Sequence, residues 1–268
     1  MQNPYLTYVK DIERALENAR DLSVSGKRGL QKSESKALLF SPHPDDECIQ
    51  GLLPLRLQRE LNFQIINVPV TFGSNKDRRT ERAEELENAC AFLGWNCHTH
   101  RSDLRDLETS EVYEIIDHYK PKAIFLPHAR DWNLRHISTH KTVMEAIDGY
   151  PDLSCWIIET EYWGQMENPN TMVASSREHL AELIAATSFH IGEVSRNPYH
   201  LTLPAWMQDN VRRGTERILG QGQGTPNYKF ATLYKAHYRK NQKIEASTLF
   251  PQQIDLEKPL QFPVKIDS

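Results

Sequence analysis

The sequence predicts an α/β protein with a mostly parallel, doubly wound sheet and helices on both of its faces. From Ala37 onward, short apolar runs alternate with segments of helical periodicity, which is the rhythm of βαβ units. The 268 residues are 39% hydrophobic, which is enough for a sizeable core, and this length fits one large domain or two small ones. Of these two, we expect one domain, and the sequence has no internal repeat.

The first 35 residues precede this alternation. Residues 5–19 have the apolar spacing of an amphipathic helix, and the polar stretch "SVSGKRGLQKSESK" after them is typical of a surface connection. We therefore expect an N-terminal helical extension over residues 1–35, followed by a single domain over residues 36–268 whose C-terminal part is rich in loops.

The expected strands and helices alternate along the rest of the chain. The strands are the runs "ALLF", "FQIINVPV", "NCHTH", "AIFLP" and "SCWIIET". The helices cover residues 52–60, 80–93, 111–119, 139–147 and 176–189. Pro54 fits the first turn of its helix, whereas Pro69 indicates a bulge or an early end of the second strand. The tail from "RNPYHLTLPAW" to "GQGQGTPNYKF" contains Pro and Gly and predicts long loops.

Composition and charge exclude several functional classes. The net charge of -4, from 32 basic and 36 acidic residues, lacks the basic excess of nucleic-acid-binding proteins and favours a small-molecule partner. The apolar runs are shorter than the roughly 18 residues of a membrane span, and the opening residues lack a secretory apolar region. We expect a soluble, cytoplasmic protein, and homo-oligomer formation stays open. The four cysteines have no C-x-x-C spacing, which predicts reduced thiols.

The stretch "SPHPDDE", residues 41–47, follows the first strand. In open α/β sheets, ligands bind outside the carboxyl ends of the strands. His43 and Asp46 are three apart, so a turn-like path lets an imidazole nitrogen and a carboxylate oxygen share one cation. Asp45 then points elsewhere and can act as a base toward water. The alternative is that the two aspartates cap the following helix.

A second cluster follows the strand "AIFLP" and contains Asp131, His136 and His140. Both clusters come after strand ends of the same parallel sheet, so both can face one crevice. His136 and His140 have the spacing of a zinc-binding H-x-x-x-H pair. The glutamate of a metalloprotease H-E-x-x-H is absent, because Ile137 stands in its place. The two clusters therefore predict a metal site of another kind.

These motifs resemble those of the PIG-L or LmbE-like metal-dependent N-deacetylases, which have a Rossmann-like fold. The resemblance covers about residues 37–238. It rests on "SPHPDDE", on the R-x-x-E of "RAEELENACAFLG", on "HISTH", and on a later helix that ends in a histidine, "VASSREHLAELIAATSFHIGEV". The family commonly has H-P-D-H where this chain has the longer "HISTH", and Asp131 can orient His136 in place of the family's aspartate.

The resemblance implies a role for each residue of the two clusters. His43, Asp46 and His140 would be the ligands of Zn²⁺ or of another divalent metal ion. Asp45 would be the general base. His136 would polarise the carbonyl group of the substrate, and the longer "HISTH" spacing leaves the alternative that His136 also binds the metal. This fits the chemistry of amide hydrolysis, because zinc lowers the pKa of bound water to about 7 and a neighbouring carboxylate can take its proton.

Four further residues are candidates for substrate binding. Arg82 either forks two hydrogen bonds onto a phosphate or carboxylate, or pairs with an acidic residue of its own helix. Asp103 or Asp106 can accept hydrogen bonds from sugar hydroxyls, and the sequence does not choose between them. Trp163 can line a sugar pocket or pack in the core.

The leading hypothesis is therefore a metal-dependent hydrolase that removes an N-acyl group, in the first place N-acetyl, from an amino sugar or its conjugate. The expected partner is a small N-acetylated sugar. The alternatives are a hydrolase of the same fold that acts on another amide or ester, and a sugar-binding protein without catalysis. A nucleotide-binding protein is disfavoured, because "HPDDE" stands where G-x-G-x-x-G would follow the first strand.

Overall fold

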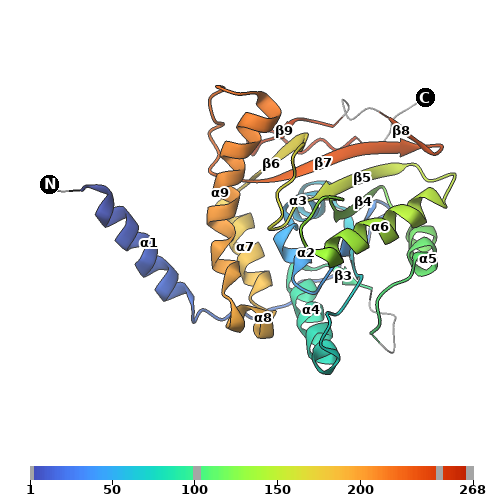
Figure 1. Ribbon diagram of the computed structural model, residues 1–268, viewed down its shortest axis with the longest axis horizontal. Coiled ribbons are helices and arrows are strands. Elements are labelled where there is room, and N and C mark those ends of the chain that lie inside the picture. Colours follow the sequence, from blue (N-terminus) through green and yellow to red (C-terminus); the bar gives the residue numbers. More distant parts are fainter. Residues whose placement is uncertain (1–2, 99–103, 246–249, 264–268) are drawn as a thin grey trace.

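The computed structural model describes residues 3–98, 104–245 and 250–263 (Figure 1). Within these residues, nine strands form one mixed sheet in the order β3-β2-β1-β4-β5-β7-β6-β9, with β8 paired to β7. The strands are β1 Lys36–Ser41, β2 Gln64–Pro69, β3 Asn96–Cys97, β4 Ala123–Pro127, β5 Cys155–Thr160, β6 Thr171–Ser175, β7 Phe230–Lys240, β8 Lys243–Glu245 and β9 Gln253–Ile254. The five strands from β3 to β5 in this order are parallel, as the sequence predicts.

Helices cover both faces of the sheet, which confirms the predicted doubly wound α/β architecture. The side chains of β1 alternate between two hydrophobic cores, because successive residues of a strand point to opposite faces. Ala37 and Leu39 pack on one face with α3, α4, α7 and α9, and Leu38 and Phe40 pack on the other with α5 and α6. The main helices are α3 Leu52–Leu61, α4 Arg79–Leu93, α5 Thr109–Tyr119, α6 Leu134–Asp148, α7 Arg177–Thr187 and α9 Leu203–Gly214.

The strand order places a topological switch point at β1. The chain passes from β1 to β2 on one side, whereas β4 joins β1 on its other side. Ligand-binding crevices in such sheets open at the carboxyl ends of the strands at this point. The segments that follow β1 and β4 are "PHPDDE" and "HARDWN", the two polar stretches that the sequence analysis singles out.

Pro54 and Pro69 both lie at positions where proline is tolerated. Pro54 is in the first turn of α3, where no intrahelical donor is lost. Pro69 is the last residue of β2 and pairs with Ser41, so the strand ends one residue earlier than the run "FQIINVPV" indicates. The second strand therefore ends at its proline.

Two parts of the chain differ from the sequence prediction. The helix expected over residues 139–147 is α6, Leu134–Asp148, which begins five residues earlier, where the Asn133 side chain accepts a hydrogen bond from the Arg135 N–H. The tail that was expected to form loops contains α9 and also β7, which lies between β5 and β6 and is antiparallel to both. Short elements precede α9: α8 Ile191–Arg196 and the 3₁₀ turn η2 Tyr199–Thr202.

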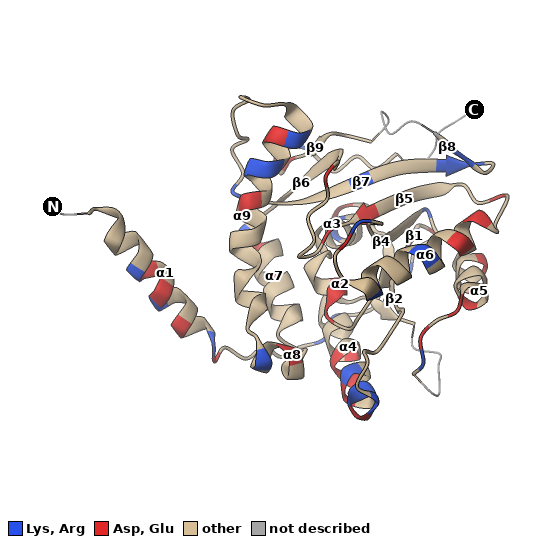
Figure 2. Cartoon of the chain, in the orientation of Figure 1, with Lys and Arg blue, Asp and Glu red and all other residues tan. Residues whose placement is uncertain are grey.

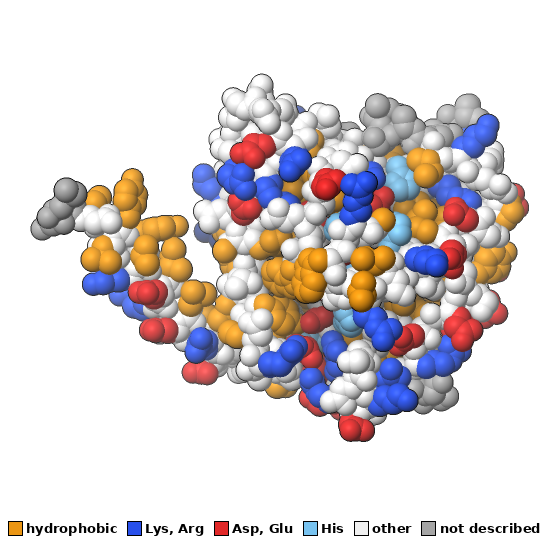
Figure 3. Space-filling model, in the orientation of Figure 1, with side chains coloured by type: hydrophobic (Ala, Val, Ile, Leu, Met, Phe, Trp, Pro, Cys, Tyr) orange, Lys and Arg blue, Asp and Glu red, His pale blue; other side chains and the backbone are white. Residues whose placement is uncertain are grey.

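The helix α1, Tyr5–Ala19, has the bounds predicted from the sequence and stands apart from the rest of the molecule (Figure 1). None of its residues is buried. Hydrophobic side chains lie along one side of α1 and charged side chains along the other (Figure 3). Residues 22–35 lead back to the body of the protein, where the Arg28 N–H donates to the Ala91 carbonyl at 2.9 Å.

Acidic and basic side chains are mixed on helices such as α4 and α9 in the view of Figure 2. No helix among the described residues has the length and apolar character to cross a lipid bilayer.

Candidate active site

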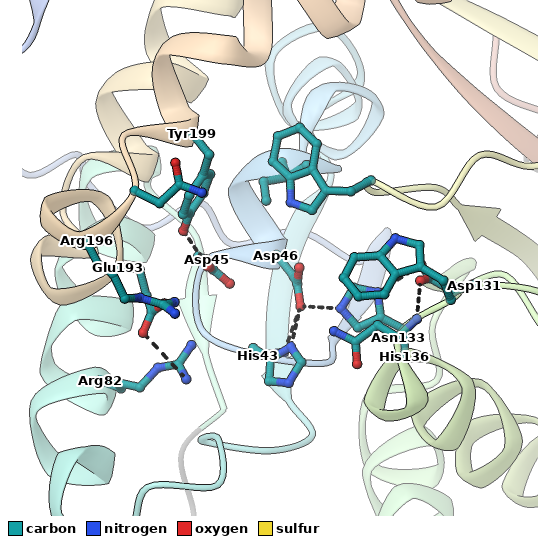
Figure 4. A pocket seen from close by; sticks show the side chains of 14 residues that line it. His43, Asp45, Asp46, Arg82, Asp131, Asn133, His136, Glu193, Arg196 and Tyr199 are labelled. Atoms are coloured by element: carbon teal, nitrogen blue, oxygen red, sulfur yellow. Dashed lines mark hydrogen bonds and ion pairs between the residues drawn. The ribbon is translucent and has the colours of Figure 1, made fainter.

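A pocket opens at the carboxyl ends of β1 and β4, at the switch point of the sheet (Figure 4). Its walls come from the loop after β1, the loop after β4 with the start of α6, and the C-terminal elements α8 and η2. The lining residues are His43, Asp45, Asp46, Ile49, Arg82, Asp131, Trp132, Asn133, His136, Trp163, Glu193, Arg196, Asn197 and Tyr199. The two predicted clusters therefore meet in one pocket.

His43, Asp46 and His136 form a compact group at the centre of this pocket. Oδ2 of Asp46 lies 3.1 Å from Nδ1 of His43 and 3.3 Å from Nε2 of His136. Their potential ligand atoms all lie within 4.8 Å of one another. Asp46 and His136 are each only 4% exposed. Two imidazole nitrogens and one carboxylate oxygen at this spacing suit a divalent metal ion.

The pKa values of His136 and Asp46 show that the surroundings of this group favour positive charge. Burial alone would lower the pKa of His136, but the carboxylates of Asp46 and Asp131 raise it to about 10. Burial would likewise raise the pKa of Asp46, but the two histidines hold it well below its usual range. A cation at this position is therefore favoured electrostatically.

Asp131 orients His136 from outside the group. Its Oδ2 atom lies 3.0 Å from Nδ1 of His136, and Asp131 is itself buried. A proton on Nδ1 that is donated to a carboxylate fixes the ring and directs Nε2 toward Asp46. The expectation that Asp131 orients this histidine is thus confirmed.

His140 does not belong to the group formed by His43, Asp46 and His136. Its Nδ1 donates a hydrogen bond to the Pro127 carbonyl at 2.8 Å, and the residue does not line the pocket. The reason is the early start of α6, which places His136 in the first turn and His140 about 6 Å further along the axis. The structure therefore brings His136, and not His140, into contact with Asp46.

Asp45 points away from Asp46, as expected for neighbouring residues with different roles. Its Oδ2 accepts a hydrogen bond from the Tyr199 hydroxyl (Figure 4). Its side chain makes no helix-capping hydrogen bond, so the capping alternative does not describe this residue. Its φ of 117° is a strained backbone conformation for a residue with a side chain, and such strain is concentrated at functional sites. Burial and the nearby Asp46 charge raise the pKa of Asp45 to about 7.

A buried pair of side chains, Glu47 and His190, supports the strained loop after β1. Oε1 of Glu47 lies 2.7 Å from Nε2 of His190, and neither residue is exposed. The other carboxylate oxygen of Glu47 accepts a hydrogen bond from the Asp45 N–H at 2.9 Å. His190 therefore belongs to the framework that shapes the loop after β1.

Arg82 lines the pocket but has a partner within the protein. Its Nη2 donates to the Pro44 carbonyl at 3.0 Å, which ties α4 to the loop after β1. The acidic residues of its own helix have other partners: Glu81 pairs with Arg78, and Glu85 accepts a hydrogen bond from the Gly192 N–H. Arg82 also forms an ion pair with Glu193 at 4.0 Å, and neither of these contacts is pairing within its own helix. Substrate binding by Arg82 stays a prediction.

The other candidates for substrate binding differ in position. Asp106 lies outside the pocket, where its Oδ2 pairs with Arg135 at 2.7 Å, and Asp103 lies outside the described residues. Trp163 lines the pocket, and its ring packs edge-to-face on Tyr199 at 5.9 Å between centroids. Trp163 is thus placed where a ligand can reach it.

The sequence does not predict the wall of the pocket that α8 and η2 form. This wall contributes Glu193, Arg196, Asn197 and Tyr199 to the pocket. Tyr199 is 154 positions away from Asp45 in the chain, and no local pattern in "RNPYH" indicates the contact. A site of this kind is found only once the fold brings the segments together.

Comparison with known proteins agrees with the motifs. Residues 38–147 match the family model PIG-L, GlcNAc-PI de-N-acetylase. The search of curated proteins gave no match. Among solved structures, the hydratase GalB from Pseudomonas putida KT2440 is 15% identical with a TM-score of 0.57, and the match covers 75% of this chain and 95% of GalB.

Two deacetylases share the fold as well. The N,N'-diacetylchitobiose deacetylase from Pyrococcus horikoshii is 14% identical with a TM-score of 0.56, over 88% of this chain and 93% of its own. A deacetylase of the teicoplanin biosynthesis pathway is 13% identical with a TM-score of 0.55, and the match covers 76% of this chain and 99% of that deacetylase. At these identities the similarity shows the fold. The match to the PIG-L family model covers residues 38–147, the segment that contains both polar clusters of the pocket.

Proposed function

We propose that this protein is a metal-dependent N-deacetylase that acts on an N-acetylated amino sugar or its conjugate. One observation carries the proposal. The same pocket contains a candidate metal-binding group, formed by His43, Asp46 and His136, and a separate carboxylate, that of Asp45, which is directed away from this group. The PIG-L match and the names of two structural neighbours, deacetylases of diacetylchitobiose and of the teicoplanin pathway, support the reaction type.

The residues of the pocket fit a divalent metal ion. Three protein ligands of nitrogen and oxygen type are the usual set of a catalytic zinc site. The carboxylates that line the pocket, Asp45, Asp46, Asp131 and Glu193, outnumber its two arginines, Arg82 and Arg196. We propose His43, Asp46 and His136 as the ligands, which replaces His140 of the sequence expectation by His136. The metal is Zn²⁺ or another divalent ion that accepts the same donors.

When bound, the metal ion supplies a Lewis acid that polarises the acetamide carbonyl and lowers the pKa of water. Asp45 accepts the proton of the attacking water and then returns it to the leaving amine. A carboxylate in the pocket that is not itself a metal ligand can take up a proton and release it again. Asp131 keeps His136 in the orientation that directs Nε2 into the pocket.

The substrate class rests on the walls of the pocket. Trp163 offers an aromatic face, which packs well on the apolar side of a pyranose ring. The polar wall of α8 and η2, with Arg196 and Asn197, offers donors for hydroxyl or anionic groups. An amino sugar has both an apolar ring face and hydroxyl groups, so it matches both walls.

The structural neighbour GalB is a hydratase on the same fold, so the fold alone does not determine the reaction. The test is a substrate panel for the zinc-loaded protein: N-acetylglucosamine, N,N'-diacetylchitobiose, N-acetylglucosamine 1-phosphate and an O-acetyl sugar, with release of acetate as the readout. We expect acetate from the N-acetyl substrates, loss of activity after chelation, and recovery on addition of metal.

Acetate from the O-acetyl sugar alone would assign an esterase instead. Absence of acetate from every compound, in a protein that binds metal, would contradict the deacetylase proposal. Asp106→Asn serves as a control, because Asp106 lies outside the pocket and pairs with Arg135. It should retain the activity of the unmodified protein.

A further inference from the structure

The hydroxyl of Tyr199 donates a hydrogen bond to Oδ2 of Asp45 from the opposite wall of the pocket (Figure 4). We infer that Tyr199 is a positioning residue that fixes the carboxylate of Asp45 for proton transfer. This inference rests on the proposed deacetylase function and adds a residue outside the segment that matches the PIG-L family, residues 38–147.

The carboxylate of Asp45 depends on Tyr199 for its orientation. The backbone of Asp45 is held through its N–H, which donates to Glu47, and by the strained φ of 117°. These contacts do not determine the rotation of the side chain. Among the described residues, Tyr199 is the one hydrogen-bond partner found for the carboxylate. With Oδ2 engaged by the hydroxyl, Oδ1 is left to accept the proton of a water molecule.

Tyr199 is itself held rigidly. Its ring packs edge-to-face on Trp163, and its carbonyl accepts a hydrogen bond from the Thr202 hydroxyl at 2.6 Å. Its N–H donates to the Asn197 carbonyl at 2.7 Å, within the turn that begins η2. A donor fixed from several sides confines its acceptor to one geometry, which is the condition for efficient proton transfer.

The hydroxyl remains a donor under ordinary conditions. Burial and the nearby charge of Asp45 raise the pKa of Tyr199 well above its usual range, so the phenol stays protonated. A protonated phenol can donate to the carboxylate of Asp45, so the contact holds this side chain in one geometry.

A purely structural role is the main alternative, because the ring of Tyr199 belongs to an aromatic cluster with Trp163 and Trp206. Tyr199→Phe separates the two roles, since it keeps the ring and removes only the hydroxyl. The control is Tyr228→Phe, which removes a hydroxyl bonded to Gln253 at a site remote from the pocket. Neither variant removes a proposed metal ligand.

The experiment measures acetate release by the zinc-loaded protein from the most active N-acetylated sugar of the panel. We expect Tyr199→Phe to lower kcat about 10- to 100-fold, the factor expected for loss of a hydrogen bond to a charged group. KM, bound zinc and the thermal midpoint should stay unchanged. In an Asp45→Asn background, Tyr199→Phe should have little further effect, because it acts through Asp45. Tyr228→Phe should retain full activity.

An unchanged kcat in an active protein would overturn the inference and leave the deacetylase function intact. A raised KM with normal kcat would also overturn it, because Tyr199 would then bind substrate. If the unmodified protein releases no acetate from any substrate, the proposed function fails. Crystal structures of the zinc-loaded protein and of Tyr199→Phe then test whether Tyr199 positions the carboxylate of Asp45. A rotated Asp45 carboxylate in the variant supports positioning by Tyr199, and an unmoved carboxylate refutes it.

Discussion

Nε2 of His136 lies 3.3 Å from Oδ2 of Asp46, although His136 belongs to α6, which follows β4, and Asp46 belongs to the segment that follows β1. This contact defines the metal group that we propose, and it makes the two histidines of "HISTH" distinguishable. His136 faces Asp46, whereas His140 donates its Nδ1 proton to the Pro127 carbonyl.

The first prediction compares these two histidines. His136→Ala should abolish stoichiometric zinc binding, because it removes one of three ligands. His140→Ala should bind zinc as the unmodified protein does. Metal content by mass spectrometry after dialysis against metal-free buffer gives the answer. Loss of zinc from His140→Ala together with retention by His136→Ala would restore the ligand set expected from the sequence.

The second prediction concerns Asp45. Asp45→Asn should keep its zinc and lose about 10² to 10⁴ in kcat, the range for general acid-base catalysis. The side chain keeps its size and can still contact Tyr199, so folding should be unaffected. Metal analysis and steady-state kinetics on one preparation separate the two effects. Loss of zinc would mean that Asp45 is a ligand.

The third prediction concerns Asp131, which holds His136 at 3.0 Å. Asp131→Asn should weaken zinc binding about 10- to 100-fold, as is typical when the hydrogen-bond partner of a ligand is changed. Competition with a chromophoric chelator measures the affinity. Thermal unfolding of Asp131→Asn is the control for damage to the helix. An unchanged affinity in Asp131→Asn would show that the ring is held by its packing alone.

The fourth prediction concerns Arg82. Because Arg82 donates to the Pro44 carbonyl, Arg82→Ala should lower kcat/KM equally for N-acetylglucosamine and for N-acetylglucosamine 1-phosphate. A reduction of about 10-fold or more is expected, as for loss of a hydrogen bond from a charged donor. Kinetics on the matched pair of substrates provide the measurement. A selective loss with the phosphate would instead assign Arg82 to substrate binding.

The fifth prediction concerns the buried pair of Glu47 and His190. His190→Ala should reduce the free energy of unfolding by about 3–5 kcal/mol, because it leaves a buried carboxylate without its partner. Urea denaturation measures this change. His118→Ala, at an exposed position of α5, should differ from the unmodified protein by less than about 0.5 kcal/mol. Equal stability of the two variants would mean that the contact between His190 and Glu47 does not stabilise the fold.

The sequence predicted those features that depend on neighbouring residues. The apolar runs identified β1, β2, β4 and β5, because a strand buried on both faces is a continuous apolar segment. His43 and Asp46 were paired correctly since they are three apart on one turn. Asp131 and His136 lie close in the chain for the same reason.

Features that depend on where a helix begins, or on contacts between residues far apart in the chain, could not be predicted from the sequence. The roles of His136 and His140 depend on where α6 begins, and "NLRHIS" has no apolar periodicity that indicates a start at Leu134. Tyr199 and β7 owe their positions to contacts with residues far away in the chain. No local pattern encodes such contacts, so they appear only in the folded structure.

The position of β7 has a consequence for how the protein is made. β6 has β7 and β9 as its partners in the sheet, and both follow it in the chain by more than fifty residues. During synthesis, β5 and β6 therefore leave the ribosome with open edges, and such edges can pair with other chains. Closure of the sheet waits until Phe230–Lys240 has emerged. A nascent chain halted before Phe230 would hence be prone to aggregate, even with the loops after β1 and β4 already synthesised.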